Sequence, residues 1–592
     1  MEQDLAVIKH FRQLLLGSLS LLLAQAAMSA EEFSWGMSLA AAQTLEELPL
    51  TPQIEPPSEQ DLRRPDILAP IPVPEELLEQ QPRPESPPPA PDVPQSVTVS
   101  AFVFEGSDVF ATEQLQQVVA DYLDRPLTFT ELFEVRDRIT DFYQEAGYVN
   151  TVAIIPPQEF EPGGTVRVQI VEGGLEAIVV NSPGRLAPDY VSQRLERYVE
   201  PPLYLPRLLE GLQLLQLDPL IEQVSAELSA GPVQGRSLLT VAVTEADVSY
   251  IEAALDNARS PSVGSFQQSV DYVDANLFGQ GERLSLGVSR TEGVAAIDGS
   301  YRWFLNPRNG TLQVSAGLTN SEVVEEPFDI LEIESEASFA EVTWRQPLTL
   351  TPTEEFAIGL TASSQGSRSI FLERFFREEV GFPTPGADDD GKSRVSALRL
   401  FKEWIKQGPQ QVFALRSQIS LGLDVLGATT GTGDTDPQFL AWRGQGQWAK
   451  LLDNNALLVA QAGVQLADGP LLPLERLGLG GPTSVRGYRQ NRLLVDNGLY
   501  GSVEARFPLY RNLPQEQLLQ ITPFLEGGYG WNSEKPDPDI DSLLSTGLGL
   551  VWEQGDALSA RLDFGLPLLS TENDGTSLQE SGVHLSFRYR FF

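Results

Sequence analysis

Sixteen segments of alternating apolar and polar residues follow one another between residues 248 and 592. Their approximate starts are residues 248, 264, 282, 296, 310, 333, 355, 393, 411, 437, 455, 497, 519, 544, 557 and 582. The alternation is clearest after residue 557, where Leu558, Ala560 and Leu562 share one face of the segment. A period of two residues is the mark of a β-strand with one apolar face. We therefore predict a mostly β fold built from sixteen strands.

The connections between these segments alternate in length. Long connections follow most odd-numbered segments, at residues 367–392, 425–436, 467–496, 532–543 and 567–581. Short turns follow most even-numbered ones, at residues 306–310, 453–455 and 554–556. A soluble sandwich also has alternating strands, but long loops at one end and short turns at the other are typical of outer-membrane barrels. We predict a 16-stranded antiparallel transmembrane β-barrel over 248–592, with both ends on the periplasmic side.

Composition narrows the range of functions. The chain has 592 residues, with 41 basic and 82 acidic side chains, no cysteine and two histidines. A net charge of −41 argues against nucleic acid as a partner. The lack of cysteine excludes thiol catalysis and cysteine-bound metals, and two histidines cannot build a multi-histidine site. We therefore expect no enzymatic activity, no cofactor and no metal.

The N-terminal 30 residues have the features of an export signal. Lys9 and Arg12 precede an apolar run at residues 14–23, and small residues at 24–26 form a candidate cleavage site. This run is too short for a hydrocarbon core that needs about 20 residues. We assign residues 1–30 to a signal peptide, with an N-terminal anchor or amphipathic helix as the alternative.

Residues 31–95 are predicted to be a proline-rich linker. Fifteen prolines fall within residues 49–94, and such a composition favours an extended, semi-rigid spacer over a packed core. A plug helix around residues 74–81 is left open, because the segment shows no firm helical signal.

Two consecutive stretches, residues 96–173 and 174–247, share one order of elements: strand, helix, helix, strand, strand. In the first stretch these elements are expected near residues 97–104, 112–122, 132–146, 152–155 and 166–171. In the second they are expected near residues 176–180, 187–198, 205–215, 224–228 and 238–243. A repeat of this kind indicates two tandem α+β domains.

Five sequence motifs resemble those of a known family of proteins. They are Tyr-Gln-Glu-Ala-Gly-Tyr-Val at 143–149, Ile-Pro-Pro-Gln at 155–158, Asp-Ala-Asn-Leu-Phe-Gly-Gln-Gly at 274–281, Val-Arg-Gly-Tyr at 485–488 and Phe-Leu-Glu-Gly-Gly at 524–528. Together they resemble the two-partner secretion transporters of the haemolysin secretion/activation (ShlB/FhaC/HecB-like) family. The resemblance implies that the two tandem units are POTRA domains. It also places the chain in a superfamily that includes outer-membrane protein insertases.

The resemblance also implies a site inside the barrel. In the family, the sixth external loop folds back into the lumen, and its arginine meets an acid on the inner wall. Here Arg486 would meet Glu526, which shares the inward face of its strand with Phe524 and Gly528; Asp563 is the alternative acid. The candidate site residues are therefore Val485, Arg486, Gly487, Tyr488, Phe524, Glu526 and Gly528, together with Asp563.

The last segment resembles the assembly signal that outer-membrane barrels present to their assembly machinery. Its outward residues are Phe587, Tyr589 and Phe591, and the chain ends at Phe592. A closing strand without a signal role would show the same pattern.

The resemblance implies a function in the outer membrane, with the POTRA domains in the periplasm. We expect a monomeric pore that captures an unfolded exoprotein, such as a haemolysin or adhesin, and secretes it. Its other expected partners are outer-membrane lipid and, during biogenesis, the barrel assembly machinery. The alternatives are an insertase-type assembly factor and a passive porin or adhesin barrel, although a diffusion pore has no need of substrate-capturing repeats.

Overall fold

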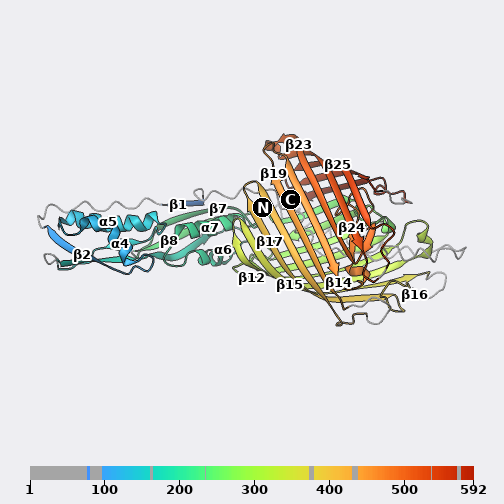
Figure 1. Ribbon diagram of the computed structural model, residues 1–592, viewed down its shortest axis with the longest axis horizontal. Helices are drawn as coiled ribbons and strands as arrows, with labels where there is room; N and C mark the ends of the chain where they lie inside the picture. Colours follow the sequence, from blue (N-terminus) through green and yellow to red (C-terminus); the bar gives the residue numbers. More distant parts are fainter. Residues whose placement is uncertain are drawn as a thin grey trace, which may run out of the picture.

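The computed structural model describes residues 77–80, 96–159, 164–233, 235–372, 379–429, 438–534, 536–569 and 575–591. It shows a closed antiparallel barrel with an arm of α+β structure projecting from one end (Figure 1). The predicted signal peptide, most of the linker and the terminal Phe592 lie outside the described residues. No helix within these ranges is long and apolar enough to cross a bilayer.

Sixteen strands form the barrel wall, and β27 (Val583–Phe591) closes it by pairing with β9 (Ser249–Asp256). The others are β10 (Gln267–Asp274), β11 (Arg283–Arg290), β12 (Val294–Asn306), β13 (Gly310–Glu322), β14 (Glu334–Thr351), β15 (Glu354–Phe371), β17 (Lys392–Gly408), β18 (Gln411–Leu423), β19 (Leu440–Leu451), β20 (Leu457–Ala467), β23 (Asn497–Asn512), β24 (Gln517–Trp531), β25 (Ser542–Gln554) and β26 (Leu558–Pro567). A two-residue strand, β16 (Val380–Gly381), extends one external loop along β15. The predicted barrel is confirmed, and every strand starts within three residues of its expected position.

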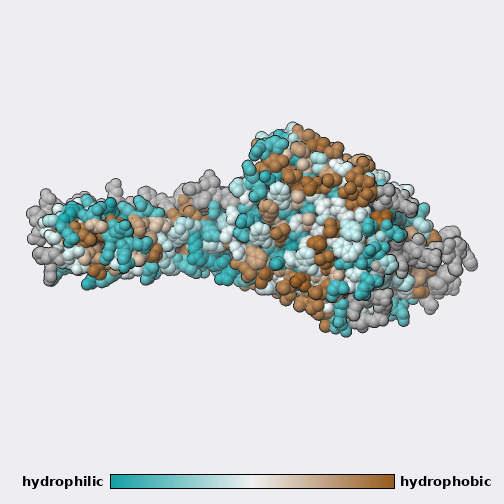
Figure 2. All heavy atoms as spheres, viewed as in Figure 1, coloured by the Kyte–Doolittle hydropathy of each residue, from teal (hydrophilic) through white to brown (hydrophobic). Residues whose placement is uncertain are grey.

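The wall has an apolar outside and a polar inside, as the alternation requires. In β26, Leu562 and Phe564 are exposed on the outer face, whereas Asp563 between them is buried in the lumen. Figure 2 shows hydrophobic residues gathered over the barrel wall. Because the apolar side chains point away from the lumen, the outer surface is suited to lipid.

The first arm domain (Val97–Val171) packs two helices against one sheet. Its elements are β2 (Val97–Glu105), α4 (Thr112–Val118), the 3₁₀ turn η3 (Ala120–Tyr122), β3 (Pro126–Leu127), α5 (Phe129–Glu145), β4 (Val152–Ile154) and β5 (Gly164–Val171). The sheet order is β3-β2-β5-β4. Helix α5 starts at Phe129, three residues before the expected position, because Thr128 and Glu131 form a capping box that satisfies two otherwise unpaired backbone amides.

The second arm domain (Gly174–Glu245) repeats this plan. Its elements are β6 (Gly174–Asn181), α6 (Pro188–Leu195), the 3₁₀ turn η4 (Glu196–Tyr198), α7 (Leu205–Gln216), β7 (Ile221–Ala230) and β8 (Arg236–Glu245). Its sheet gains a fourth strand, β1 (Leu78–Gln80), which pairs with β7. A plug helix was left open at 74–81; of this segment the structure describes residues 77–80, where Leu77 is helical and Leu78–Gln80 form a strand on the edge of β7.

The motif around Gly147 forms the joint between the arm domains. Gly147 has a φ of +98°, and a β-carbon there would lie 2.9 Å from the ring of Tyr204. The rings of Tyr148 and Tyr204 lie 5.1 Å apart across the joint, and the amide of Leu205 donates to the Gly147 carbonyl. A glycine is needed here because the backbone of the first domain lies directly against an aromatic ring of the second.

The turn between β10 and β11 fixes the arm to the barrel. The side chain of Asn276 is buried, accepts from the Gly281 amide at 3.0 Å and donates to Glu245 at 2.7 Å. Arg185 of the second arm domain bonds Asp274 of the barrel at 2.9 Å. The arm is thus joined through buried polar contacts to the first hairpins of the wall.

We predict that Asn276→Ala loosens this joint without unfolding the barrel. The change leaves the buried Gly281 amide without its acceptor, which costs about 1–3 kcal/mol, and removes one of the hydrogen bonds to Glu245. Limited proteolysis should cut residues 245–250 faster, while heat-modifiable migration of the barrel stays unchanged. Phe278→Ala is the matched control, because Phe278 lies in the same turn and is 74% exposed. Equal cleavage of both variants would contradict the prediction.

Candidate functional site

The loop between β20 and β23, residues 468–496, folds back inside the barrel; we call it the returning loop. It contains a small hairpin, β21 (Leu477–Leu479) paired with β22 (Leu493–Val495). The hairpin packs with the motif and the wall in one apolar cluster: Leu477, Leu479, Val485, Tyr488, Leu493, Val495 and Leu543. Asp496 at the base of the loop accepts from the Leu471 amide at 3.0 Å and pairs with Arg476 at 3.2 Å. The tip of the loop, residues 480–488, is therefore held at a defined place.

Arg486 is buried at this tip and meets three carboxylates. Its Nε and Nη2 donate to Glu526 Oε1 at 2.9 and 2.5 Å, and its backbone amide donates to Glu526 Oε2 at 2.6 Å. Its Nη1 donates to Glu504 at 2.8 Å and to Asp563 at 3.1 Å. The guanidinium also lies 3.6 Å from the centre of the Phe524 ring. A planar fork of five donors can satisfy all these partners at once, whereas an ammonium group cannot.

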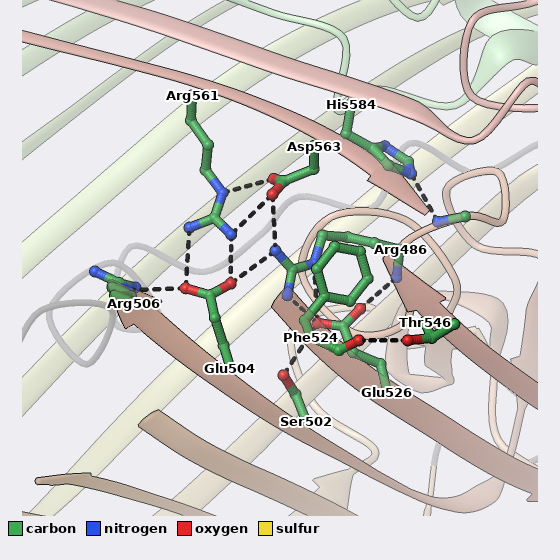
Figure 3. Close-up of polar contacts among 11 residues, drawn as sticks. Arg486, Ser502, Glu504, Arg506, Phe524, Glu526, Thr546, Arg561, Asp563 and His584 are labelled. Carbon is green, nitrogen blue, oxygen red and sulfur yellow. Dashed lines mark hydrogen bonds and ion pairs between the residues drawn. The ribbon is translucent and has the colours of Figure 1, made fainter. Parts of the chain in front are cut away.

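Two further arginines complete what we call the lumen charge cluster: Arg486, Arg506, Arg561, Glu504, Glu526 and Asp563 (Figure 3). Arg561 bonds Glu504 at 2.5 Å and Asp563 at 2.6 Å, and Arg506 bonds Glu504 at 2.8 Å. Three positive and three negative groups balance, so the cluster carries no net charge. Buried charges are tolerated only when they are paired and hydrogen-bonded in this way.

Gly487 brings the loop backbone against the wall. Its φ is +94°, and a β-carbon on the facing Gly565 would lie 2.5 Å from the Gly487 nitrogen. The Gly487 amide donates to Nε2 of His584 in β27 at 3.0 Å. The imidazole accepts this hydrogen bond only when Nε2 carries no proton. Two glycines and a neutral histidine thus allow the closest approach of loop and wall.

The other motif residues support the arginine. Tyr488 donates through its hydroxyl to wall carbonyls, with Leu544 O at 2.9 Å, and accepts from the Leu544 amide at 3.2 Å. Val485 packs above Gly528, where a β-carbon would lie 3.3 Å from it. Gly547 makes room for the ring of Phe524, because a β-carbon there would lie 2.4 Å from the ring.

Beyond the tip, the returning loop is tied to two other external loops. Arg489 forms a bidentate ion pair with Glu325, at 3.0 and 2.8 Å, in the loop between β13 and β14. The Gln490 amide donates to Gln579, in the loop between β26 and β27, at 2.7 Å. Hydrogen bonds and an ion pair thus join three loops at the end of the barrel opposite the arm.

The structure places the candidate residues as follows. Val485, Arg486, Gly487, Tyr488, Phe524, Glu526 and Gly528 lie together, with Asp563. Glu526 and Asp563 were alternatives in the sequence, yet Arg486 bonds both. Within the described ranges, no group of acidic or histidine side chains is arranged to hold a metal ion.

Sequence reasoning missed Glu504, Arg561 and His584. Alternation along residues 497–512 puts Glu504 on the inward face, so that signal was available. Phe587, Tyr589 and Phe591 face outward in β27. Phe592 lies outside the described residues, and the assembly-signal role stays a prediction.

Comparison with known proteins matches both halves of this architecture. Residues 97–173 match the ShlB-type POTRA domain, and residues 390–552, which contain the returning loop, match the haemolysin secretion/activation protein ShlB/FhaC/HecB. This chain thus contains a ShlB-type POTRA domain and a haemolysin secretion/activation domain. The predicted resemblance is confirmed, and the family places the barrel in the outer membrane with the arm on the periplasmic side.

Curated relatives of the family match over most of their length. The outer membrane transporter CdiB of Escherichia coli O6:K15:H31 (strain 536 / UPEC) is 24% identical over 80% of this chain and 79% of its own. The heme/hemopexin transporter protein HuxB of Haemophilus influenzae (strain ATCC 51907 / DSM 11121 / KW20 / Rd) is 21% identical over 79% of this chain and 83% of its own. The solved structure of CdiB from Escherichia coli superposes with a TM-score of 0.63 at 19% identity, covering 86% of this chain and 93% of that one. At this identity the solved structure supports the fold.

The contacts of the lumen charge cluster predict unequal effects of removing its members. After Glu526→Ala, Arg486 keeps Glu504 and Asp563, whereas after Arg486→Ala the Glu526 side chain keeps only Ser502 and a backbone amide. Leaving one charge buried and unpaired costs about 3–5 kcal/mol, and about 1.4 kcal/mol already shifts an equilibrium tenfold. We therefore expect Arg486→Ala to release the loop more than Glu526→Ala.

The chain has no cysteine, so one introduced cysteine reports on the loop cleanly. Ser484→Cys is nearly isosteric, and Ser484 is 6% exposed. Labelling of this position by a membrane-impermeant maleimide should be fastest with Arg486→Ala, slower with Glu526→Ala and slowest in the parent. Equal rates in both variants would show that the cluster does not hold the loop.

His584 is predicted to act through its acceptor nitrogen. His584→Ala leaves the buried Gly487 amide without an acceptor, which costs about 1–3 kcal/mol, and should raise labelling of the same reporter severalfold. His584→Gln should stay near the parent, because the side-chain oxygen of glutamine can take the place of Nε2. Equal labelling rates of the His584→Ala and His584→Gln variants would show that the imidazole contributes packing and not a hydrogen bond.

Proposed function

We propose that this chain is the transporter of a two-partner secretion system. The arm receives an unfolded exoprotein in the periplasm, and the barrel passes it across the outer membrane. The observation that carries the proposal is the returning loop, held inside a barrel whose one end bears two α+β domains, the first of which matches a POTRA domain. No catalytic step is required, so we propose that the chain is not an enzyme.

A pore of this width needs a gate, and we assign this role to the returning loop. Sixteen strands enclose a lumen wide enough for an aqueous channel, as in porins of similar strand number. At rest, Arg486 and its three carboxylates keep the loop within that lumen. Secretion then requires a change in the loop's position, and the free energy of the cluster sets how often this occurs.

We propose three further properties of this transporter: its lipid contact, its assembly partner and its monomeric state. The apolar outer wall contacts outer-membrane lipid, and the aromatic outward face of β27 is read by the barrel assembly machinery during biogenesis. A single chain closes the barrel, so a monomer suffices. A large β-helical exoprotein encoded next to this chain is the expected cargo. An insertase role gains no specific support from the site.

The proposal is tested by secretion of the exoprotein from cells that express both partners. We predict that Arg486→Ala lowers secretion at least tenfold while the heat-modifiable barrel accumulates normally. Arg486→Lys should rescue poorly, because an ammonium group lacks the planar fork. Arg345→Ala is the matched control: Arg345 pairs with Glu403 and Glu355 on the inner wall, away from the loop.

Exchange of the two charges distinguishes a cluster from an isolated pair. In the double variant Arg486→Glu with Glu526→Arg, the new carboxylate faces Glu504 and Asp563, so secretion should stay low. Normal secretion by Arg486→Ala would refute the gating role. A loss of other outer-membrane proteins with normal export would instead favour an insertase.

A further inference from the structure

Three lysines lie close together on two strands of the barrel wall. The chain has 41 basic side chains, but only six of them are lysine: Lys9, Lys392, Lys402, Lys406, Lys450 and Lys535. Lys402 and Lys406 belong to β17 and Lys450 to β19, and these strands are separated only by β18 (Figure 1). Half of all the lysines in the chain are therefore gathered on one part of the wall.

The alternation of both strands places these lysines on the outer face. In β17, Leu400 is exposed on the outside, and steps of two residues lead from it to Lys402 and Lys406. In β19, Trp442 is exposed on the outside, and the same steps lead to Lys450. Successive side chains of a strand point to opposite faces, so the three ammonium groups belong to the surface that faces lipid.

Along the barrel axis, the lysines lie near the end that bears the arm. Strand β17 ends at Gly408 and β19 ends at Leu451, both at this periplasmic end. Trp404 and Trp448 are outward neighbours of the lysines on the same strands. Outward tryptophans mark the level at which hydrocarbon gives way to lipid headgroups. The lysines therefore lie at the headgroup level of the periplasmic leaflet.

One carboxylate shares this surface, and it already has partners. Glu354 of β15 accepts from Nε1 of Trp404 at 2.8 Å and lies 4.0 Å from the ammonium of Lys406. Lys402 and Lys450 form no ion pair with any carboxylate of the described residues. Three ammonium groups against one carboxylate leave this part of the wall with a net positive charge.

This charge is a local feature of the wall. In β20, β25, β26 and β27, every outward residue of the described strands is uncharged. The other lysine of β17, Lys392, lies at the opposite end of the strand and pairs with Asp390 at 3.0 Å. A charged side chain on a lipid-facing surface is unfavourable unless it reaches the interface, where its cost is small. Positive groups at this level suit the phosphates that lie there.

We propose that Lys402, Lys406 and Lys450 bind the headgroup of an anionic phospholipid in the periplasmic leaflet. Their ammonium groups attract its phosphate, and Trp404 and Trp448 pack beside its glycerol and upper acyl chains. Lysine suits this contact because its flexible stem lets the charge follow a mobile headgroup. This inference goes beyond the proposed secretion function and requires only that the barrel lies in the outer membrane.

The scarcity of lysine makes a direct test possible in the parent protein. The full-length transporter is placed in nanodiscs of phosphatidylcholine, with or without an equal part of phosphatidylglycerol, and is treated with a water-soluble acetylating reagent. Mass spectrometry then gives the rate at each lysine. Phosphatidylglycerol should slow acetylation of Lys406 and Lys450 about fivefold, because the headgroup covers them. Lys392 is the internal control and should react equally in both nanodiscs. Equal rates at Lys406 and Lys450 in both would overturn the proposal.

Binding of the lipid to variants gives a second readout. Native mass spectrometry of the transporter in detergent counts bound phosphatidylglycerol. The triple variant Lys402→Gln, Lys406→Gln and Lys450→Gln should bind it about tenfold more weakly than the parent, whereas the matched control Lys392→Gln should bind it like the parent. All variants should keep the heat-modifiable migration of the folded barrel, because the substitutions lie at the headgroup level.

Two further results would contradict the proposal. Equal binding of phosphatidylglycerol by the parent and the triple glutamine variant would show that the lysines form no headgroup site. Displacement of the lipid by the same concentration of inorganic phosphate would show that the site takes a free anion and not a phospholipid. We expect inorganic phosphate to leave the bound lipid in place, since it lacks the acyl chains that contact the wall.

Discussion

A permanently charged guanidinium buried inside the barrel is the constraint on which the closed state depends. Arg486 cannot lose its proton, so it is stable in the lumen only where enough negative charge converges. That charge comes from β23, β24 and β26, which supply Glu504, Glu526 and Asp563. Since these three carboxylates meet at one point, the returning loop has one position in which its arginine is satisfied. The neighbouring glycines leave room for the loop backbone to approach that point, and Tyr488 bonds the loop to the wall there.

The two ends of the molecule use polar contacts in different ways. At the joint between arm and barrel, Asn276 and Arg185 bond groups of the neighbouring domain, so polar contacts cross the boundary directly. In the lumen, one arginine of the returning loop meets carboxylates from three strands of the wall. The edge of β7 is a third case, where a backbone ladder is completed by a three-residue strand from outside the domain.

Much of this architecture could be read from the sequence, for definite reasons. The barrel strands were placed closely because a two-residue period and glycine- or asparagine-rich turns are local signals. Alternation also put Glu526 and Asp563 on the inner face. Alternation could not show which of the two acids pairs with Arg486. The interpretation assumed a single partner for Arg486, whereas strands β23 to β26 bring several inward-facing residues to the same level of the lumen. The hydrogen bond from Gly487 to His584 joins residues almost a hundred positions apart, and no local pattern encodes it.

The β1 strand was beyond sequence reasoning for another reason. A strand of three residues is too short to show periodicity, and its partner strand lies more than a hundred residues away in the chain. Whether residues 78–80 are helical or extended is therefore decided by the sheet edge on which they lie.

The neutrality of the lumen charge cluster has an electrical consequence. When Arg486 leaves the cluster, Glu504, Glu526 and Asp563 stay on the wall with Arg506 and Arg561. The cluster itself then carries one uncompensated negative charge, and acidic groups in a pore lining favour the passage of cations. The departure of a single arginine thus changes the electric field at this level of the lumen.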